Sequence, residues 1–289
     1  GRMTYPGILH HYSPRKVAFE FTSTPRKKVL IFVGGMGDGL LTVPYIPVLV
    51  DKLATLNWSL VQIQLDSSFK GWGTSSLADD IEGIRSLVDY LKSEQGGSRE
   101  KIVLMGHSTG SQDTIHYLLN HGDTIDAGIL QGSVSDRESF ALEIDPQAQE
   151  RLNSEAQQLL SGGRGDELLP AEFARRADKT PITAYRWCSI MVPGGDDDYF
   201  SSDLAEETIS STFGKLNKPF LVAYSEADEF VPQSVDKHAL LGKWENHSNP
   251  KCWSKNSGLI PGASHNVKQK EPQEYLCNMV SEFIKEFDL

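Results

Sequence analysis

The feature that most constrains the fold of this chain is a strand-like run that leads directly into a serine flanked by glycines. Residues 101–105 (KIVLM) have the composition of a buried strand, GHSTG follows at 106–110, and an amphipathic helical pattern comes next. A serine in so sharp a turn has a strained backbone, and side chains two residues to either side of it would collide, so glycine fits both positions. A tight glycine-rich turn without chemistry is the alternative, but the strand and helix around it favour an exposed nucleophile at Ser108.

Strand and helix patterns alternate through most of the remaining chain. Further strand patterns lie at 29–33, 60–65, 127–130, 219–224 and 259–260, and helical patterns at about 76–93, after the serine and at the C-terminus. Such alternation predicts a mostly parallel central sheet with helices on both faces. Between about 137 and 217 there is no buried-strand pattern. We therefore expect a single domain over 1–289, with an inserted helical lid or cap at approximately 137–217.

A serine hydroxyl becomes an effective nucleophile when a base removes its proton, and histidine titrates in the right range. In folds with a serine at such a turn, the acid and the histidine follow in that order, each after a strand. Asp228 follows the strand at 219–224, and His265 follows the strand at 259–260. Glu226 and Glu229 remain alternatives for the acid. The order predicts an α/β-hydrolase fold with Ser108, Asp228 and His265 as its catalytic triad.

The chain has eight histidines, so the others must be weighed against His265. His107 is the variable residue of GHSTG, and we expect its side chain to point away from the reacting atoms. His10 and His11 are expected to precede the first strand of the sheet. The remaining histidines do not follow a strand; they are His116, His121, His238 and His247.

The tetrahedral intermediate of ester hydrolysis needs backbone N–H donors aimed at its oxyanion. One is expected from Thr109, which follows the serine. The other is expected from the glycine-rich loop GGMGDG at 34–39, from Met36 or, as the alternative, Gly35. This loop lacks the GKS/T ending of a phosphate-binding loop, so we do not expect nucleotide binding.

Composition excludes several other classes of protein. The formal net charge of −11 argues against a nucleic-acid-binding surface. No apolar run approaches the roughly 20 residues that span a bilayer, and the first residues lack the apolar core of a signal peptide. The three cysteines are far apart and include no CxxC pair, which disfavours disulfides and structural zinc. We expect a cytoplasmic enzyme with no metal, no cofactor, and no nucleic-acid or membrane partner.

Four sequence strings together resemble a known family. They are FVGGMGDG at 32–39, GWGTSSL at 71–77, GHSTGSQ at 106–112 and DDDYFSSDL at 196–204. The chain resembles, from about residue 30 to its C-terminal helix, a family of fungal α/β-hydrolases that includes the SidJ-type siderophore esterases, which act on fusarinine C. The resemblance implies a serine esterase that hydrolyses a hydroxamate siderophore inside the cell and helps to release its iron. The iron belongs to the substrate, so no metal site in the protein follows.

The same strings suggest substrate contacts from Gly35, Trp72, Asp197 and Tyr199. Trp72 lines the pocket or, alternatively, packs beneath it. The acidic run at 196–198 attracts substrate amines or is a solvated or capping loop. Two other functions remain open: a serine carboxylesterase or thioesterase with another small substrate, and a catalytically silent hydrolase-fold binding protein. The many charges of the inserted region argue against a lipase that acts at a lipid surface.

Overall fold

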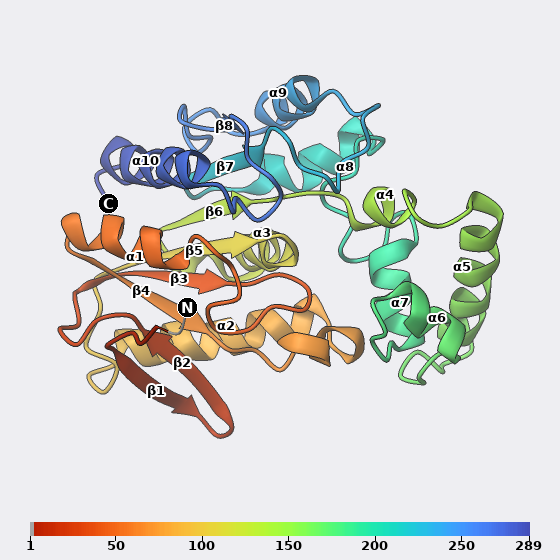
Figure 1. Cartoon of the computed structure of the whole chain (residues 1–289), viewed down its shortest axis with the longest axis horizontal. Coiled ribbons are helices and arrows are strands. Elements are labelled where there is room, and N and C mark those ends of the chain that lie inside the picture. Colours follow the sequence, from red (N-terminus) through yellow and green to blue (C-terminus); the bar gives the residue numbers. More distant parts are fainter. Residues whose placement is uncertain (1–2) are drawn as a thin grey trace.

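An eight-stranded, mostly parallel sheet forms the centre of the computed structural model, which describes residues 3–289 (Figure 1). Its strand order is β1-β2-β4-β3-β5-β6-β7-β8, and the pairings of β2 with β1 and β4 are antiparallel while the others are parallel. The strands are β1 Ile8–Ser13, β2 Lys16–Glu20, β3 Lys28–Val33, β4 Trp58–Ile63, β5 Lys101–His107, β6 Ala127–Gln131, β7 Phe220–Ser225 and β8 Gly258–Ile260.

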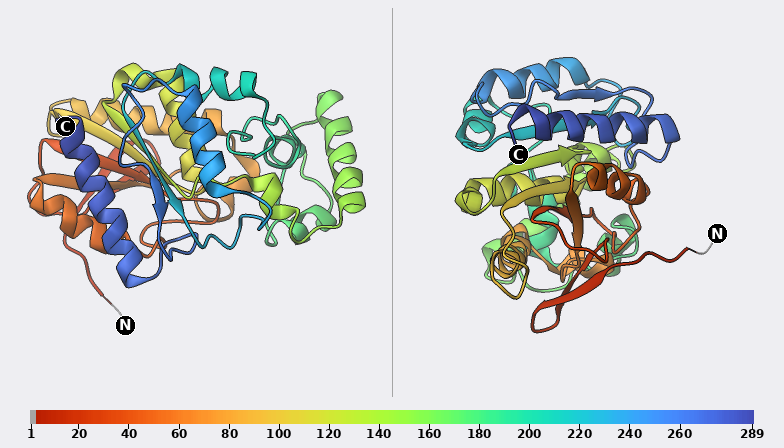
Figure 2. Two further views of the ribbon diagram at one scale, coloured as in Figure 1. Left: turned by 90° about the horizontal axis from the view of Figure 1, so that it is seen from above. Right: turned by 90° about the vertical axis from the view of Figure 1, so that its left-hand side faces the viewer.

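Helices cover both faces of this sheet (Figure 2). α1 (Ile46–Thr55) and α10 (Lys270–Glu286) pack on one face, and α2 (Leu77–Lys92), α3 (Thr109–His121) and α9 (Lys237–His247) pack on the other. Alternate residues of β3 enter the two cores, as the two-residue period of a strand requires. Among residues 3–289, no helix combines the length and apolar composition needed to cross a membrane.

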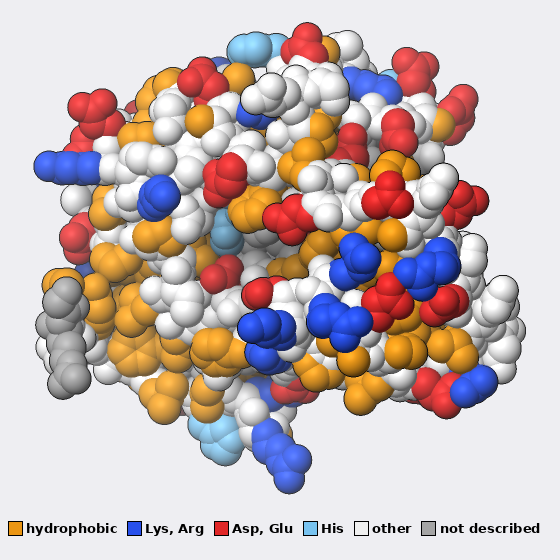
Figure 3. Space-filling view, turned by 45° about the vertical axis from the view of Figure 1, so that its right-hand side comes forward, with side chains coloured by type: hydrophobic (Ala, Val, Ile, Leu, Met, Phe, Trp, Pro, Cys, Tyr) orange, Lys and Arg blue, Asp and Glu red, His pale blue; other side chains and the backbone are white. Residues whose placement is uncertain are grey.

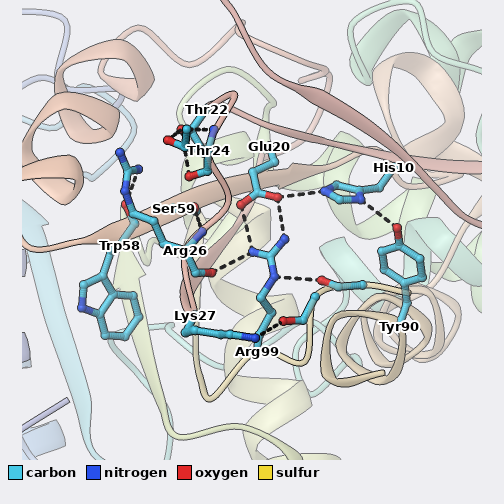
Figure 4. A network of polar contacts seen from close by, with 12 residues as sticks. His10, Glu20, Thr22, Thr24, Arg26, Lys27, Trp58, Ser59, Tyr90 and Arg99 are labelled. Carbon is cyan, nitrogen blue, oxygen red and sulfur yellow. Dashed lines mark hydrogen bonds and ion pairs between the residues drawn. The ribbon is translucent and has the colours of Figure 1, made fainter. Parts of the chain in front are cut away.

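The N-terminal hairpin of β1 and β2 was not predicted, and the expectation that His10 and His11 precede the sheet is wrong. Both histidines lie in β1, at the edge of the sheet. Edge strands are partly exposed, so their apolar pattern is weak; β1 has one buried residue, His10. A buried network fixes this hairpin to the body (Figure 4): Glu20 accepts hydrogen bonds from both terminal nitrogens of Arg99, at 2.8 and 2.7 Å.

The region expected as a cap has two parts in the structure. Its helices are α4 (Asp136–Phe140), α5 (Pro146–Ser161), α6 (Ala171–Arg176), α7 (Ala184–Met191) and α8 (Glu206–Ser211), followed by the 3-10 turn η3 (Phe213–Lys215). α5, α6 and α7 enclose a small core of their own and project beyond the carboxyl ends of the parallel strands (Figure 1). Residues 199–216 instead join the core of the sheet, where Phe213 stacks on Trp244 at 4.9 Å. We use the name cap for α4–α7.

Candidate active site

The turn between β5 and α3 places Ser108 in a strained conformation. Its φ is 56° and its ψ −120°, which few residues other than glycine adopt. A Cβ at Gly106 would lie 1.8 Å from the carbonyl oxygen of Gly110, and a Cβ at Gly110 would lie 2.3 Å from that of Val33. Both flanking glycines are therefore sterically required, and the turn presents Ser108 at the carboxyl edge of the sheet.

The three residues of the predicted triad come together in space. His265 Nε2 lies 2.8 Å from Ser108 Oγ, and His265 Nδ1 lies 2.7 Å from Asp228 Oδ2. Because the carboxylate accepts the Nδ1 proton, Nε2 is left as the acceptor for the serine hydroxyl. Asp228 is buried, and its Oδ1 also accepts the backbone N–H of Phe230 at 3.0 Å. The imidazole is thus oriented from one side and faces the hydroxyl on the other.

The two alternative acids contact the histidine loop through its backbone. Glu229 Oε2 accepts the backbone N–H of His265 at 3.1 Å, and Glu226 Oε1 accepts that of Gly262 at 3.1 Å. Of the three carboxylates in this segment, Asp228 is the one that contacts the imidazole ring. The geometry therefore favours Asp228 over both glutamates, which hold the loop in place.

The prediction that His107 points away from the reacting atoms is wrong. Its ring lies 5.0 Å from the ring of His265 and borders the same cavity. Burial, and then the neighbouring His265, lower the pKa of His107 to about 4, so its ring is neutral at pH 7. His107 Nδ1 lies 2.6 Å from Gln131 Oε1 and, because that amide oxygen can only accept, Nδ1 donates.

Sequence reasoning missed Gln131, whose side chain connects His107 to the loop that carries His265. Its Nε2 donates to the carbonyl oxygen of His265 at 3.0 Å, and its Oε1 also accepts the hydroxyl of Tyr45 at 2.7 Å. A polar residue that ends the apolar strand at 127–131 was the available signal. Gln131 therefore helps to hold His265 in place through the backbone of that residue.

The glycine-rich loop after β3 lies against Ser108. The N–H of Gly35 donates to Asp38 Oδ2 at 2.8 Å, so it is already occupied, and a Cβ at Gly35 would lie 2.8 Å from that of Ser108. Within residues 3–289, neither the N–H of Met36 nor that of Thr109 donates to another protein group. These two amides are free to bind an oxyanion, and Gly35 instead allows the close approach of the loop.

A cavity of about 960 Å³ opens over Ser108 between the body and the cap. Figure 3 shows this face of the molecule, where hydrophobic side chains line a hollow bordered by charged groups of both signs. Apolar lining comes from Met36, Val43, Trp72, Val134, Phe140, Leu142, Ile144 and Phe230, and two arginines of α6 lie at the cap side, Arg175 and Arg176. Among the described residues 3–289, no group of three or more His, Cys, Asp or Glu side chains could hold a metal ion.

The predicted substrate contacts divide into two groups. Trp72 lines the cavity and also packs into the core of the cap, so both of its expected roles have structural support. Asp197 and Tyr199 do not line the cavity. The Asp197 carboxylate is buried and accepts from Arg186, while the Tyr199 hydroxyl lies 2.6 Å from Nδ1 of His116. A contact from either side chain to a substrate in this cavity is not supported by the structure.

The acidic run at 196–198 is bonded within the protein. The Tyr185 hydroxyl donates to Asp196 at 2.5 Å, and Asp198 pairs with Arg137 at 2.9 Å. With Asp197 also paired, the run does not present a cluster of free carboxylates to a substrate. The hypothesis that it attracts substrate amines is therefore not supported, because arginine and tyrosine side chains already neutralise or occupy these groups.

Comparisons with known proteins agree with this architecture. A protein-family model described as "Protein of unknown function (DUF1749)" matches residues 2–285. The chain belongs to this family. It is 39% identical to the UPF0613 protein PB24D3.06c of Schizosaccharomyces pombe, over 97% of this chain and 96% of the relative. It is 37% identical to the fusarinine C esterase sidJ of Aspergillus fumigatus, over 95% and 94% of the two chains.

A solved structure supports the same relationship. The siderophore hydrolase EstB from Aspergillus fumigatus superimposes with a TM-score of 0.84 at 36% identity, and 98% of each chain is covered. An α/β-hydrolase fold protein of unknown function also matches, with a TM-score of 0.71 at 18% identity, which shows a common fold. The resemblance to the family of siderophore esterases and the predicted α/β-hydrolase fold are both confirmed.

Proposed function

We propose that the protein is a serine esterase in which Ser108 is the nucleophile, His265 the general base and Asp228 the group that orients the base. The observation that carries this proposal is the hydrogen-bonded line from Asp228 through His265 to Ser108, which ends at the cavity. Its family relatives named for their activity are esterases or hydrolases, which supports the same reaction.

In the first half of the reaction, His265 Nε2 takes the hydroxyl proton as Ser108 Oγ attacks the ester carbonyl carbon. The resulting oxyanion accepts hydrogen bonds from the backbone N–H groups of Met36 and Thr109. The imidazolium then gives its proton to the leaving alcohol oxygen, the carbon–oxygen bond breaks, and an acyl-serine remains. Asp228 stabilises the imidazolium during this step.

In the second half, water takes the place of the alcohol. His265 removes a proton from the water as its oxygen attacks the acyl carbonyl carbon, and the same amides bind the second oxyanion. The imidazolium returns its proton to Ser108 Oγ as the acyl–oxygen bond breaks. The carboxylic acid leaves and the free serine is restored.

For the substrate, we propose an ester of a hydroxamate siderophore such as ferric fusarinine C. Two relatives at 36–37% identity are a fusarinine C esterase and a siderophore hydrolase. The cavity of about 960 Å³ lies at the upper end of the range for small-molecule sites, which suits a bulky ligand. In this proposal the cap of α4–α7 covers the bound chelate, and the iron enters and leaves as part of the substrate.

Two measurements test these proposals separately. A fluorophosphonate probe should label the wild-type protein and should not label Ser108→Ala; labelling of neither would support a silent binding protein instead. Turnover of ferric fusarinine C, followed by mass spectrometry, tests the substrate. Hydrolysis of simple carboxyl esters or thioesters without turnover of the chelate would retain the serine hydrolase and overturn the siderophore assignment.

A further inference from the structure

Two sequence strings that resemble the family, at 71–77 and 196–204, have no part in the proposed chemistry. In the structure they approach each other beneath the cap, and the side chain between them is Arg186 of α7. Arg186 Nε donates to the carbonyl oxygen of Trp72 at 2.9 Å, and its Nη1 donates to Asp197 Oδ1 at 2.9 Å. Arg186 is fully buried. This cap residue therefore joins two separate segments of the chain.

The backbone around Arg186 is in close contact with the body. The N–H of Thr183, at the start of α7, donates to the carbonyl oxygen of Gly73 at 3.0 Å. A Cβ at Gly73 would lie 2.0 Å from the carbonyl oxygen of Pro181. The backbone of the cap at Pro181 thus packs so closely on the backbone of the body at residue 73 that only glycine fits there.

Arg186 is also the cation of a carboxyl-rich cluster. The charges of Asp80 on α2, Asp113 on α3, Asp136 on α4 and Asp197 all act on its guanidinium. Burial raises the pKa of Asp197 to about 6, although Arg186 lowers it, and burial together with Asp197 raises the pKa of Asp136 to about 7. One guanidinium thus faces carboxyls that come from three helices and a loop. Removing it would raise the pKa values of these carboxyls further and would leave any that stays ionised buried without its counter-charge.

The cluster extends to the wall of the cavity. Asp136 lines the cavity beside Ser108, and its Oδ2 accepts from Gln112 Nε2 at 2.6 Å. Trp72, whose carbonyl oxygen binds Arg186, lines the same cavity. A displacement of Arg186 would therefore move two parts of the wall that a large ligand touches.

We propose that Arg186 is a positioning residue that fixes the cap to the body and thereby sets the walls formed by Trp72 and Asp136 over Ser108. Its position affects the hydrolysis of esters that are large enough to contact these walls, and it leaves the positions of Ser108, His265 and Asp228 unchanged. This inference rests on the proposed esterase function.

The test compares a small ester with a large one in the same variants. For Arg186→Met, kcat/KM for p-nitrophenyl decanoate should fall about 10- to 100-fold, mainly through KM, since small displacements of positioning groups have effects of this order. For p-nitrophenyl acetate, kcat/KM should stay within about 2-fold of the wild-type value, because its two-carbon acyl group has little surface to contact these walls. Arg186→Lys keeps the positive charge but lacks the planar guanidinium that donates to both Trp72 and Asp197. Its kcat/KM for the large ester should lie between those of the wild type and Arg186→Met.

Matched variants control for stability. Arg151→Met removes an exposed cap arginine that pairs with Glu172 at 2.6 Å, and should leave both esters unaffected. If Arg186→Met does not fold, Asp197→Asn, which keeps the side-chain volume, should show the same selective loss to a smaller degree. Equal losses for the two esters in a folded variant, or no loss for either, would overturn the proposal.

A second readout does not depend on catalysis. Limited trypsin digestion should cut the cap of Arg186→Met faster than that of the wild type or Arg151→Met, because the cap is released from the body. Unchanged digestion would also overturn the proposal. If the wild type hydrolyses neither ester and is not labelled by the fluorophosphonate probe, the proposed function fails, while the digestion still reports whether Arg186 anchors the cap.

Discussion

Glu20 anchors the N-terminal hairpin, and its replacement by glutamine should change how stability depends on pH. The carboxylate is fully buried and accepts hydrogen bonds from Arg99, while His10 Nε2 lies 2.9 Å away (Figure 4). Burial raises the pKa of Glu20, but the hydrogen bonds from His10, Arg99 and Ser59 outweigh it and lower the pKa from 4.5 to about 2. Folding therefore favours the ionised form of this side chain.

The size of the effect follows from that shift. A pKa lowered by about 2.5 units corresponds to about 3 kcal/mol of stability. Because the folded pKa is the lower one, this contribution is present above about pH 4.5 and is lost as the pH falls toward 2. About 1 kcal/mol should be lost between pH 5 and pH 3.5. Glu20→Gln cannot ionise, so it lacks this loss, and it should be about 3–5 kcal/mol less stable at pH 7 because Arg99 is left unpaired.

Urea unfolding followed by tryptophan fluorescence, at pH 7, 5 and 3.5, measures both quantities. The difference in unfolding free energy between the wild type and Glu20→Gln should narrow by about 1 kcal/mol from pH 5 to pH 3.5. Asp66→Asn is the control, since Asp66 is an exposed carboxylate that pairs with Lys16 at 3.3 Å, and its effect should stay below about 1 kcal/mol throughout. A constant difference between the wild type and Glu20→Gln over this range would refute the reasoning.

Three further substitutions test the site. Asp228→Asn should lower kcat by about 10⁴-fold with little change in thermal stability, because the amide does not hold His265 in the tautomer that accepts the serine proton; a loss below about tenfold in steady-state kinetics would contradict this role. Gly110→Ala should abolish fluorophosphonate labelling or prevent folding, because its Cβ would overlap the carbonyl oxygen of Val33; a folded variant that is labelled at the wild-type rate would argue against the steric requirement. Gln131→Leu should lower the unfolding free energy by about 1–3 kcal/mol, since it leaves the buried donors of His107 and Tyr45 without an acceptor. It should also lower kcat, because the hydrogen bond to the backbone of His265 is lost. Urea unfolding and ester turnover measure the two effects, and an unchanged kcat would mean that Gln131 does not support His265.

Much of the fold and the core of the site could be predicted because their causes are local. The turn at Ser108 depends on two glycines within five residues, whose missing side chains relieve contacts that any larger residue would make. The buried strands are visible as apolar runs, and parallel strands bring their carboxyl ends to one edge of the sheet. Residues placed after successive strands, such as Asp228 and His265, are therefore brought near Ser108 by the topology.

The tertiary structure decided which polar groups pair with one another. Asp197 looked like a free acidic residue, but a buried arginine of the cap requires its charge. His107 was expected to face away, yet Gln131, from the neighbouring strand, binds it beside His265. Such pairings join residues that are distant in the chain and depend on burial, which no local pattern records. The sequence by itself determined the turn, the strands and the chain order of the three residues of the proposed triad. The assembled sheet and cap determined the charge environment around them, because desolvation and pairing exist only once the chain has packed.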